Sequence, residues 1–253
     1  MIHDSLHSIG CGILGHAEVT DKRDATGKML LAIEGIDGAG KGTLCRELLT
    51  LAQGRDIRAA ALSFPRYEEN QFADLVARYL RGEMGAINQV PVRYAALLYG
   101  GDRFESRAEL LALIADHDLV ILDRYVASNM AYNAAKLPAG ERDDLIAWID
   151  RLEFTMFELP RPDLTLLLAT STQLAHRMVG EKAARSYTQQ TRDMHEADRD
   201  YLAVVADVYG DLAKAGGEGW LTVNPLDEDA NLRPPQDIAA MIWQHPALAA
   251  LGG

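Results

Sequence analysis

Short apolar runs alternate along the chain with longer segments in which apolar residues recur every three or four positions. Short continuous apolar runs are typical of buried strands, and the longer spacing is typical of amphipathic helices. Five runs predict strands at residues 29–34, 58–64, 119–123, 164–169 and 220–223. The segments around them predict helices at 41–53, 71–81, 92–116, 127–135, 142–157, 172–179, 191–215 and 236–250.

This alternation predicts an α/β fold, a doubly wound five-stranded parallel sheet with helices on both faces. No internal repeat or low-complexity linker divides residues 29–253, so we expect a single domain. Residues 1–28 lack the apolar period of a helix and the basic start and apolar core of a secretory signal. We expect them to form a disordered tail.

Composition excludes several classes of protein. The 25 Lys and Arg residues against 37 Asp and Glu residues give a net charge of −12, which argues against a broad nucleic-acid surface. No apolar run approaches the length of a membrane span. Two cysteines, Cys11 and Cys45, cannot form a disulfide framework and favour a reducing compartment, so we expect a cytoplasmic protein without nucleic-acid or membrane partners.

A glycine-rich segment follows the first predicted strand and leads into the first predicted helix. Its residues are Gly35, Ile36, Asp37, Gly38, Ala39, Gly40, Lys41, Gly42 and Thr43. Glycines let backbone N–H groups turn towards phosphate oxygens, the helix N-terminus adds its dipole, and a lysine at this spacing reaches the β- and γ-phosphates. The segment therefore predicts a phosphate loop that binds ATP.

One position of this loop departs from the usual pattern. Gly42 stands where a Ser or Thr that ligates Mg²⁺ is usual, and Thr43 follows one place later. Adenylate kinase and related nucleotide kinases use the same Gly-Lys-Gly-Thr form, which favours small kinases over GTPase-like switches. Asp123, at the carboxyl end of a predicted strand, has the place of the acid that serves Mg²⁺ in phosphate-loop enzymes.

Three further clusters lie at residues 64–67, 99–103 and 123–132. In this order, and together with the phosphate loop, they resemble the bacterial thymidylate kinase family over residues 29–223. The resemblance implies a phosphate-loop nucleoside monophosphate kinase that uses ATP and Mg²⁺ to convert dTMP to dTDP in dTTP synthesis. It also implies a homodimer.

The chemistry of these clusters suits a thymine nucleotide. Tyr99 offers a flat face to the base, and Arg103, four residues along the same helix face, can donate to the thymine O4. Asn129 can accept from the ring N3–H. Tyr132 looks like the family's tyrosine that crowds the sugar 2′ position and favours deoxyribose.

The resemblance also assigns contacts to the acceptor phosphate. Asp37 resembles the family's carboxylate beside the 3′-hydroxyl and this phosphate, and Arg124 and Arg66 are expected to hold it. The remaining predicted dTMP contacts are Phe64, Tyr67 and Ser128.

In the family, the segment at residues 179–192 is a lid that closes over ATP. Phosphoryl transfer leaves charge on the equatorial oxygens, and the phosphate loop has no arginine, so Lys182 and Arg185 are the expected catalytic cations of the lid. Asp193 and Glu196 look like the family's acidic pair, although His195 stands where an aromatic residue is common.

The expected Mg²⁺ ligands, partly through water, are Asp37, Asp123 and Glu196. Residues 223–225, after the last predicted strand, are expected to form a wall for adenine.

Two alternatives stay open at this point. One is another nucleotide or nucleoside kinase, against which the clusters at 64–67 and 128–132 argue. The other is a nucleotide-binding switch without kinase activity, which Gly42 and the predicted acceptor pocket disfavour.

Overall fold

A parallel sheet forms the centre of the molecule. The computed structural model describes residues 27–86, 89–185 and 199–251, so nearly all of the predicted tail lies outside the described residues. Within these ranges the strands are parallel and lie in the order β2-β3-β1-β4-β5. Their bounds are β1 Met29–Glu34, β2 Ala59–Ser63, β3 Leu119–Asp123, β4 Leu164–Leu168 and β5 Trp220–Val223.

Burial along the strands explains the sequence pattern. Every residue of β1 and β4 is buried, because both faces of these inner strands are covered by helices. The edge strands β2 and β5 are only partly buried. The predicted fold class is confirmed, and the ends of the predicted strands differ from the observed ends by at most one residue.

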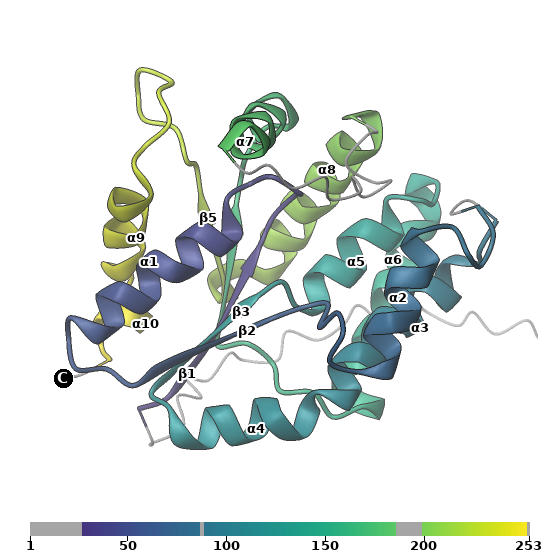
Figure 1. The fold of residues 1–253 in the computed structure, drawn as a ribbon, viewed down its shortest axis with the longest axis horizontal. Coiled ribbons are helices and arrows are strands. Elements are labelled where there is room, and N and C mark those ends of the chain that lie inside the picture. Colours follow the sequence, from purple (N-terminus) through teal and green to yellow (C-terminus); the bar gives the residue numbers. More distant parts are fainter. Residues whose placement is uncertain (1–26, 87–88, 186–198, 252–253) are drawn as a thin grey trace, which may run out of the picture.

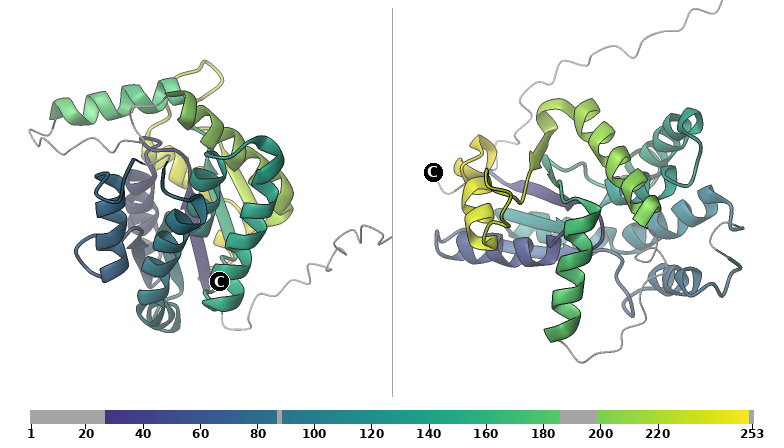
Figure 2. Two further views of the ribbon diagram at one scale, coloured as in Figure 1. Left: turned by 90° about the vertical axis from the view of Figure 1, so that its right-hand side faces the viewer. Right: turned by 90° about the horizontal axis from the view of Figure 1, so that it is seen from above.

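Helices cover both faces of this sheet (Figure 1). The α-helices are α1 Lys41–Gln53, α2 Gln71–Leu80, α3 Val92–Glu105, α4 Arg107–Asp116, α5 Val126–Ala134, α6 Arg142–Asp150, α7 Thr172–Arg185, α8 Arg199–Gly216, α9 Pro235–Trp243 and α10 Pro246–Ala249. Helices α1 and α9 pack together on one face, α4, α5 and α8 lie on the other, and α3 and α6 pack against α5. Figure 2 shows α7 projecting outward from the body of the domain. No helix in the described ranges has the length and apolarity needed to cross a membrane.

The helix predicted at residues 92–116 is wrong in one respect, because α3 and α4 are separate helices that meet at Ser106. The Ser106 hydroxyl donates to the carbonyl oxygen of Asp102 at 2.9 Å. A serine that bonds four residues back bends a helix.

Two further predicted helices are divided. The helix predicted at 142–157 consists of α6 and a π-helix, Arg151–Met156. The helix predicted at 236–250 is interrupted at His245, which takes the extended angles φ −60° and ψ 133° before Pro246. Proline disfavours helical angles in the residue that precedes it.

The helix predicted at 172–179 continues to Arg185, so the first part of the predicted lid is helical. Residues 186–198, which include the start of the helix predicted at 191–215, lie outside the described residues.

Sheet register brings the functional segments to one edge. Ile33 pairs with Asp123 on β3 and with Leu166 on β4, so β1, β3 and β4 end side by side. The loops that follow these strands meet at the carboxyl edge, where ligands of doubly wound folds bind.

Candidate active site

The loop between β1 and α1 turns on glycines with positive φ angles, which are 143° at Gly35, 79° at Gly38 and 93° at Gly40. A Cβ on Gly35 would lie 2.8 Å from the carbonyl oxygen of Leu168, and one on Gly40 would lie 3.2 Å from Cε of Met178. Strain and crowding therefore favour glycine at both positions. No described side chain caps the N-terminus of α1, so its N–H groups and its dipole are available to an anion.

Lys41 is buried inside this loop. Its Nζ donates to the carbonyl oxygens of Gly35 at 3.0 Å and Ile36 at 2.9 Å. Burial and the nearby charge of Arg124 lower the pKa of Lys41 to about 8, although Asp37 acts in the opposite direction. The ammonium group thus lies in the concave loop where phosphates are predicted to bind, and its contact with them stays a prediction.

Asp123 faces the start of α1. Its Oδ2 lies 3.1 Å from the place where Gly42 would carry a Cβ, which is where the usual hydroxyl residue would stand. Mg²⁺ commonly takes one or two carboxylates together with substrate phosphates and waters, and Asp123 fits that chemistry. In the described ranges, no three acidic, His or Cys side chains gather as metal ligands. The Thr43 hydroxyl accepts a hydrogen bond from Nη2 of Arg46 at 3.2 Å.

Arg124 connects the phosphate loop with α5. Its guanidinium is ion-paired with Asp37 and donates to the carbonyl oxygen of Gly35 at 3.4 Å and to Oγ of Ser128 at 3.3 Å. Its backbone φ is 69°, a strained value for a residue with a side chain. Although burial acts in the opposite direction, attraction to Asp37 raises the pKa of Arg124 well above its ordinary value. A permanent cation therefore lies between the two predicted phosphate sites.

Tyr132 lies against this pair. Its hydroxyl accepts from the backbone N–H of Asp37 at 2.9 Å, and the Arg124 guanidinium carbon is 5.3 Å from the centre of its ring. Burial raises the pKa of Tyr132 well above its ordinary value, so the group stays a phenol at neutral pH. The structure brings Asp37, Arg124 and Tyr132 together, as their predicted common role in dTMP binding requires.

The sequence interpretation did not include Glu34, which the structure places at the centre of this region. Its Oε1 accepts from the backbone N–H groups of Tyr125 at 2.9 Å and Ser128 at 3.1 Å, at the N-terminus of α5. Its Oε2 accepts from the hydroxyls of Ser128 at 2.6 Å and Tyr209 at 3.0 Å. Glu34 thus caps α5 from a neighbouring strand. A charged residue at the end of an otherwise apolar strand was the available signal.

Ser128 has a structural partner in this arrangement. Its hydroxyl donates to Glu34, and the predicted contact of Ser128 with dTMP stays a prediction.

The base-recognition residues Arg103 and Asn129 lie together beneath the edge of the sheet. Arg103 is 2% exposed and pairs with the fully buried carboxylate of Glu153 through Nε at 2.5 Å and Nη2 at 2.7 Å. Asn129 donates to the same carboxylate at 2.7 Å. Burial opposes the charge of Arg103, but attraction to Glu153 raises the pKa of its guanidinium. Glu153 was missed because its partners lie 24 and 50 residues away in the sequence.

The other residues predicted to contact dTMP differ in how far their side chains are exposed to solvent. Phe64 is buried, and the guanidinium carbon of Arg103 is 5.9 Å from the centre of its ring. Tyr99 is half-buried on α3, and Tyr67 is exposed. Arg66 is ion-paired with Glu69 and, at 2.8 Å, with Glu109. The predicted contact of Arg66 with a phosphate therefore requires the phosphate to compete with these two carboxylates.

Part of the predicted lid lies outside the described residues. Lys182 and Arg185 belong to α7, but their side chains lie outside the described ones, as do Asp193, His195 and Glu196 entirely.

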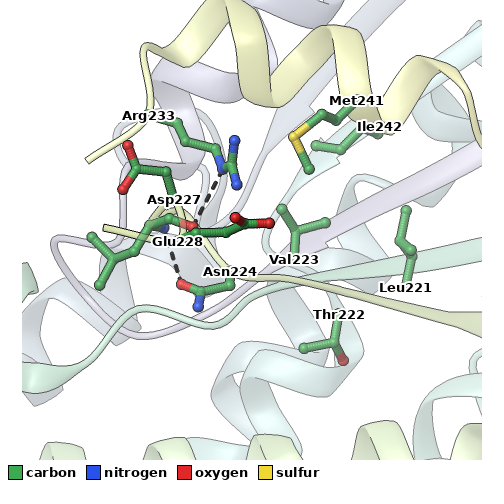
Figure 3. Close-up of a pocket in the computed structure, with 10 residues that line it drawn as sticks. Leu221, Thr222, Val223, Asn224, Asp227, Glu228, Arg233, Met241 and Ile242 are labelled. Atoms are coloured by element: carbon green, nitrogen blue, oxygen red, sulfur yellow. Dashed lines mark hydrogen bonds between the residues drawn. The ribbon is translucent and has the colours of Figure 1, made fainter. Parts of the chain in front are cut away.

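The predicted adenine wall borders a cavity of about 450 Å³ between β5, the loop that follows it and α9 (Figure 3). Val223 and Asn224 line it, together with the apolar Met241 and Ile242. Arg233 crosses the loop side and donates to the carbonyl oxygen of Leu226 at 3.3 Å. An apolar wall beside polar loop atoms suits a purine, and this role stays a prediction.

A phosphate loop at the carboxyl edge of a parallel sheet, with Arg124 facing it from a second segment, defines the class of phosphate-loop kinases. Comparisons of the chain with known proteins specify the family. The family model described as thymidylate kinase matches residues 33–230, and the chain belongs to this family.

Relatives with known names support this membership. The chain is 40% identical over 212 residues to a thymidylate kinase of Mycobacterium tuberculosis, which covers 82% of this chain and 98% of that protein. It is 31% identical over 179 residues to a probable thymidylate kinase of Methanocorpusculum labreanum, covering 71% of this chain and 84% of that protein. The predicted family and the predicted phosphotransferase class are therefore confirmed.

A solved structure supports the fold. Thymidylate kinase from Candida albicans matches with a TM-score of 0.65 at 19% identity, over 89% of this chain and 94% of that chain.

Proposed function

We propose that this enzyme transfers the γ-phosphoryl group of ATP to dTMP, giving dTDP. The observation that carries the proposal is the position of Arg124, whose guanidinium touches both Gly35 and Asp37 of the phosphate loop and Ser128 of α5. A cation between donor and acceptor segments is suited to holding two phosphates in line, which is most of what phosphoryl transfer requires of a protein.

On the donor side, the amides of residues 35–43 and the N-terminus of α1 cradle the ATP phosphates. Lys41 exchanges its contacts with Gly35 and Ile36 for phosphate oxygens. Bound Mg²⁺ would neutralise phosphate charge. Asp123, which faces Gly42, would hold it, with Asp37 and Glu196 as further candidates through water.

On the acceptor side, Arg124 holds the dTMP phosphate, Asp37 lies beside the 3′-hydroxyl, and Tyr132 crowds the 2′ position. The pair of Arg103 and Asn129 reads the thymine edge, with Tyr99 and Phe64 as the apolar walls around it. The aromatic residues contribute stacking area, and the polar pair contributes discrimination.

Closure of the segment at 179–192 completes the site. Lys182 and Arg185 then stabilise the charge that develops on the transferred phosphoryl group.

The proposed reaction is tested with purified protein, Mg-ATP and a panel of nucleoside monophosphates. We expect dTMP to be the preferred acceptor, dUMP to be weaker, and dCMP and dAMP to be poor, because a site built for specific hydrogen bonds rejects a base that leaves them unpaired. Equal rates across the panel would refute the assignment to dTMP.

We further propose a cytoplasmic homodimer. Large apolar side chains are exposed on α3 and on the adjoining π-helix, namely Tyr94, Phe104 and Met156. Exposed apolar groups of this size are typical of association surfaces. Light scattering of the purified protein tests the dimer.

A further inference from the structure

A buried carboxylate, that of Glu153, joins the two residues that are predicted to recognise the base. It has no exposed surface, and burying a carboxylate is costly unless several donors compensate it. Three atoms donate to it, namely Nε and Nη2 of Arg103 and Nδ2 of Asn129, and Gly100 lies beside its Cγ. Every polar neighbour named here belongs to a segment predicted to contact the base.

The backbone around Glu153 has two unusual features, a π-helical turn and a closely packed glycine on α3. Glu153 lies in the π-helix that follows α6, and π-helical turns occur frequently at functional sites. A Cβ on Gly100 as large as that of alanine would lie 3.5 Å from Cγ of Glu153 and 3.3 Å from Cε2 of Phe157. The tighter of these contacts is the one with Phe157, so the glycine lets α3 pack closely against this segment.

The hydrogen bonds of Asn129 allow only one orientation of its amide group. Nδ2 donates to Oε1 of Glu153 at 2.7 Å and to the carbonyl oxygen of Ala96 at 2.9 Å. Both partners can only accept, so they use both N–H groups of the amide. Oδ1 accepts from Nδ2 of Asn133 at 2.7 Å, which supports the same orientation, and keeps a second lone pair.

This orientation has a consequence for base selection. With both N–H groups in use, Asn129 can offer a base only its oxygen, which accepts from the N3–H of thymine and repels the unprotonated N3 of cytosine. Arg103 is fixed by the same carboxylate, which takes two of its five N–H donors and leaves the rest for an acceptor such as O4.

We propose that Glu153 is a positioning residue that makes the site selective for thymine by fixing both Arg103 and Asn129. This inference rests on the proposed function, because it assigns the base preference of the same site. Glu153 acts through its two neighbours and does not touch the substrate.

Glu153→Gln tests the proposal, since glutamine keeps the shape but can donate as well as accept. A neutral amide at this place removes one of the two acceptors that fix the Asn129 amide and the charge that fixes Arg103, so both side chains are held less firmly in the orientation that suits thymine. We expect the ratio of kcat/KM for dTMP to that for dCMP to fall about tenfold or more, with KM for ATP changed less than about twofold. Glu153→Asp retains a carboxylate and should restore part of the ratio.

Glu158→Gln is the matched control. Its exposed carboxylate pairs with Arg107 at 3.0 Å and also joins the end of this segment to α4, but it has no contact with the base residues. We expect the dTMP to dCMP ratio to stay at the wild-type value in this variant.

A second variant covers the case in which Glu153→Gln does not fold, as judged by its thermal melt. Glu153→Asp draws the carboxylate back from Arg103 and Asn129 without removing its charge and should lower the ratio by about threefold. An unchanged ratio in folded Glu153→Gln, or in Glu153→Asp where the first variant is unfolded, would overturn the proposal.

The test also separates this inference from the proposed function. A wild-type enzyme that phosphorylates neither nucleotide would refute the proposed function. The role of Glu153 would then be tested by calorimetry. The dissociation constants for dTMP and dCMP are measured in the wild type and in the variant, and their ratio is compared between the two proteins.

Discussion

The phosphate loop and the proposed acceptor pocket are suited to the same task, binding a charged nucleotide, in different ways. The loop is one continuous segment, residues 35–43, whose backbone N–H groups and single buried lysine are proposed to bind the phosphates. The proposed pocket is assembled from α3, α5, the π-helix and the residues that follow β2 and β3, and its Arg103 and Arg124 are paired with carboxylates from other segments. Backbone recognition needs only a local motif, whereas base recognition needs side chains that other side chains hold in place.

The two regions also differ in the kind of charge they use. Burial lowers the pKa of Lys41 to about 8, so this group titrates near physiological pH. Carboxylate partners raise the pKa values of Arg103 and Arg124 against the effect of burial, so both guanidinium groups stay charged over the pH range in which Lys41 titrates. Donor and acceptor binding should therefore respond differently to mutation and to pH.

Lys41→Met should have the largest effect. The methionine keeps the apolar stem but removes the charge from the loop, and transition-state contacts of this kind contribute about 3–4 kcal/mol, so we expect a loss of about a thousandfold in kcat. Steady-state kinetics with a thermal melt test this. A folded variant with a kcat near that of wild type would show that the loop does not need its lysine.

Arg124→Ala should come next and should be selective for the acceptor. We expect kcat/KM for dTMP to fall about a hundredfold, while KM for ATP changes less than about threefold, because Lys41 and the loop amides that are proposed to hold ATP stay in place. Equal losses for both substrates would contradict the division into donor and acceptor regions. The exposed ion pair of Arg58 and Asp118 offers a control, since Arg58→Ala should leave both parameters unchanged.

The third effect separates the lid from both regions. Arg185→Ala should lower kcat about tenfold, and the double variant with Lys182→Ala should lower it further, with KM for dTMP nearly unchanged. This pattern is expected of groups that act mainly in the transition state. Normal kcat in the folded double variant would direct attention to Arg177 or Arg192.

Most of the fold was predictable because its determinants are local. Buried strands give continuous apolar runs, and the glycines around Lys41 mark the turn from β1 into α1. The break at Ser106 was not predictable from apolar spacing, since α3 and α4 continue the same helical period. At this point the Ser106 hydroxyl donates to the carbonyl oxygen of Asp102, a contact that apolar spacing does not report.

The site was predictable to the extent that its residues are clustered in the sequence. Asp37, Arg124 and Tyr132 were expected to act together and are in contact. Glu34 and Glu153 were missed because neither belongs to a cluster of candidate residues in the sequence, and their partners are distant in the chain. Such residues are recognised only when the tertiary structure shows which donors surround them.

The smallest effect that bears on the comparison of the two regions is a pH dependence confined to the donor side. In the free enzyme Lys41 has a pKa of about 8, so its charged fraction falls about fourfold between pH 7 and pH 8.5. Bound phosphates favour the charged lysine and raise its pKa in the complex, so kcat/KM for ATP should fall by about fourfold over this range while kcat stays nearly constant. Over the same range kcat/KM for dTMP, measured at saturating ATP, should also stay constant, because Arg124 and Arg103 remain charged. Initial rates at a series of pH values and constant ionic strength decide the matter. A decline that is equal for ATP and dTMP would show that the titrating group serves both substrates, and the difference between a lysine loop and an arginine pocket would then not explain the binding of the two nucleotides.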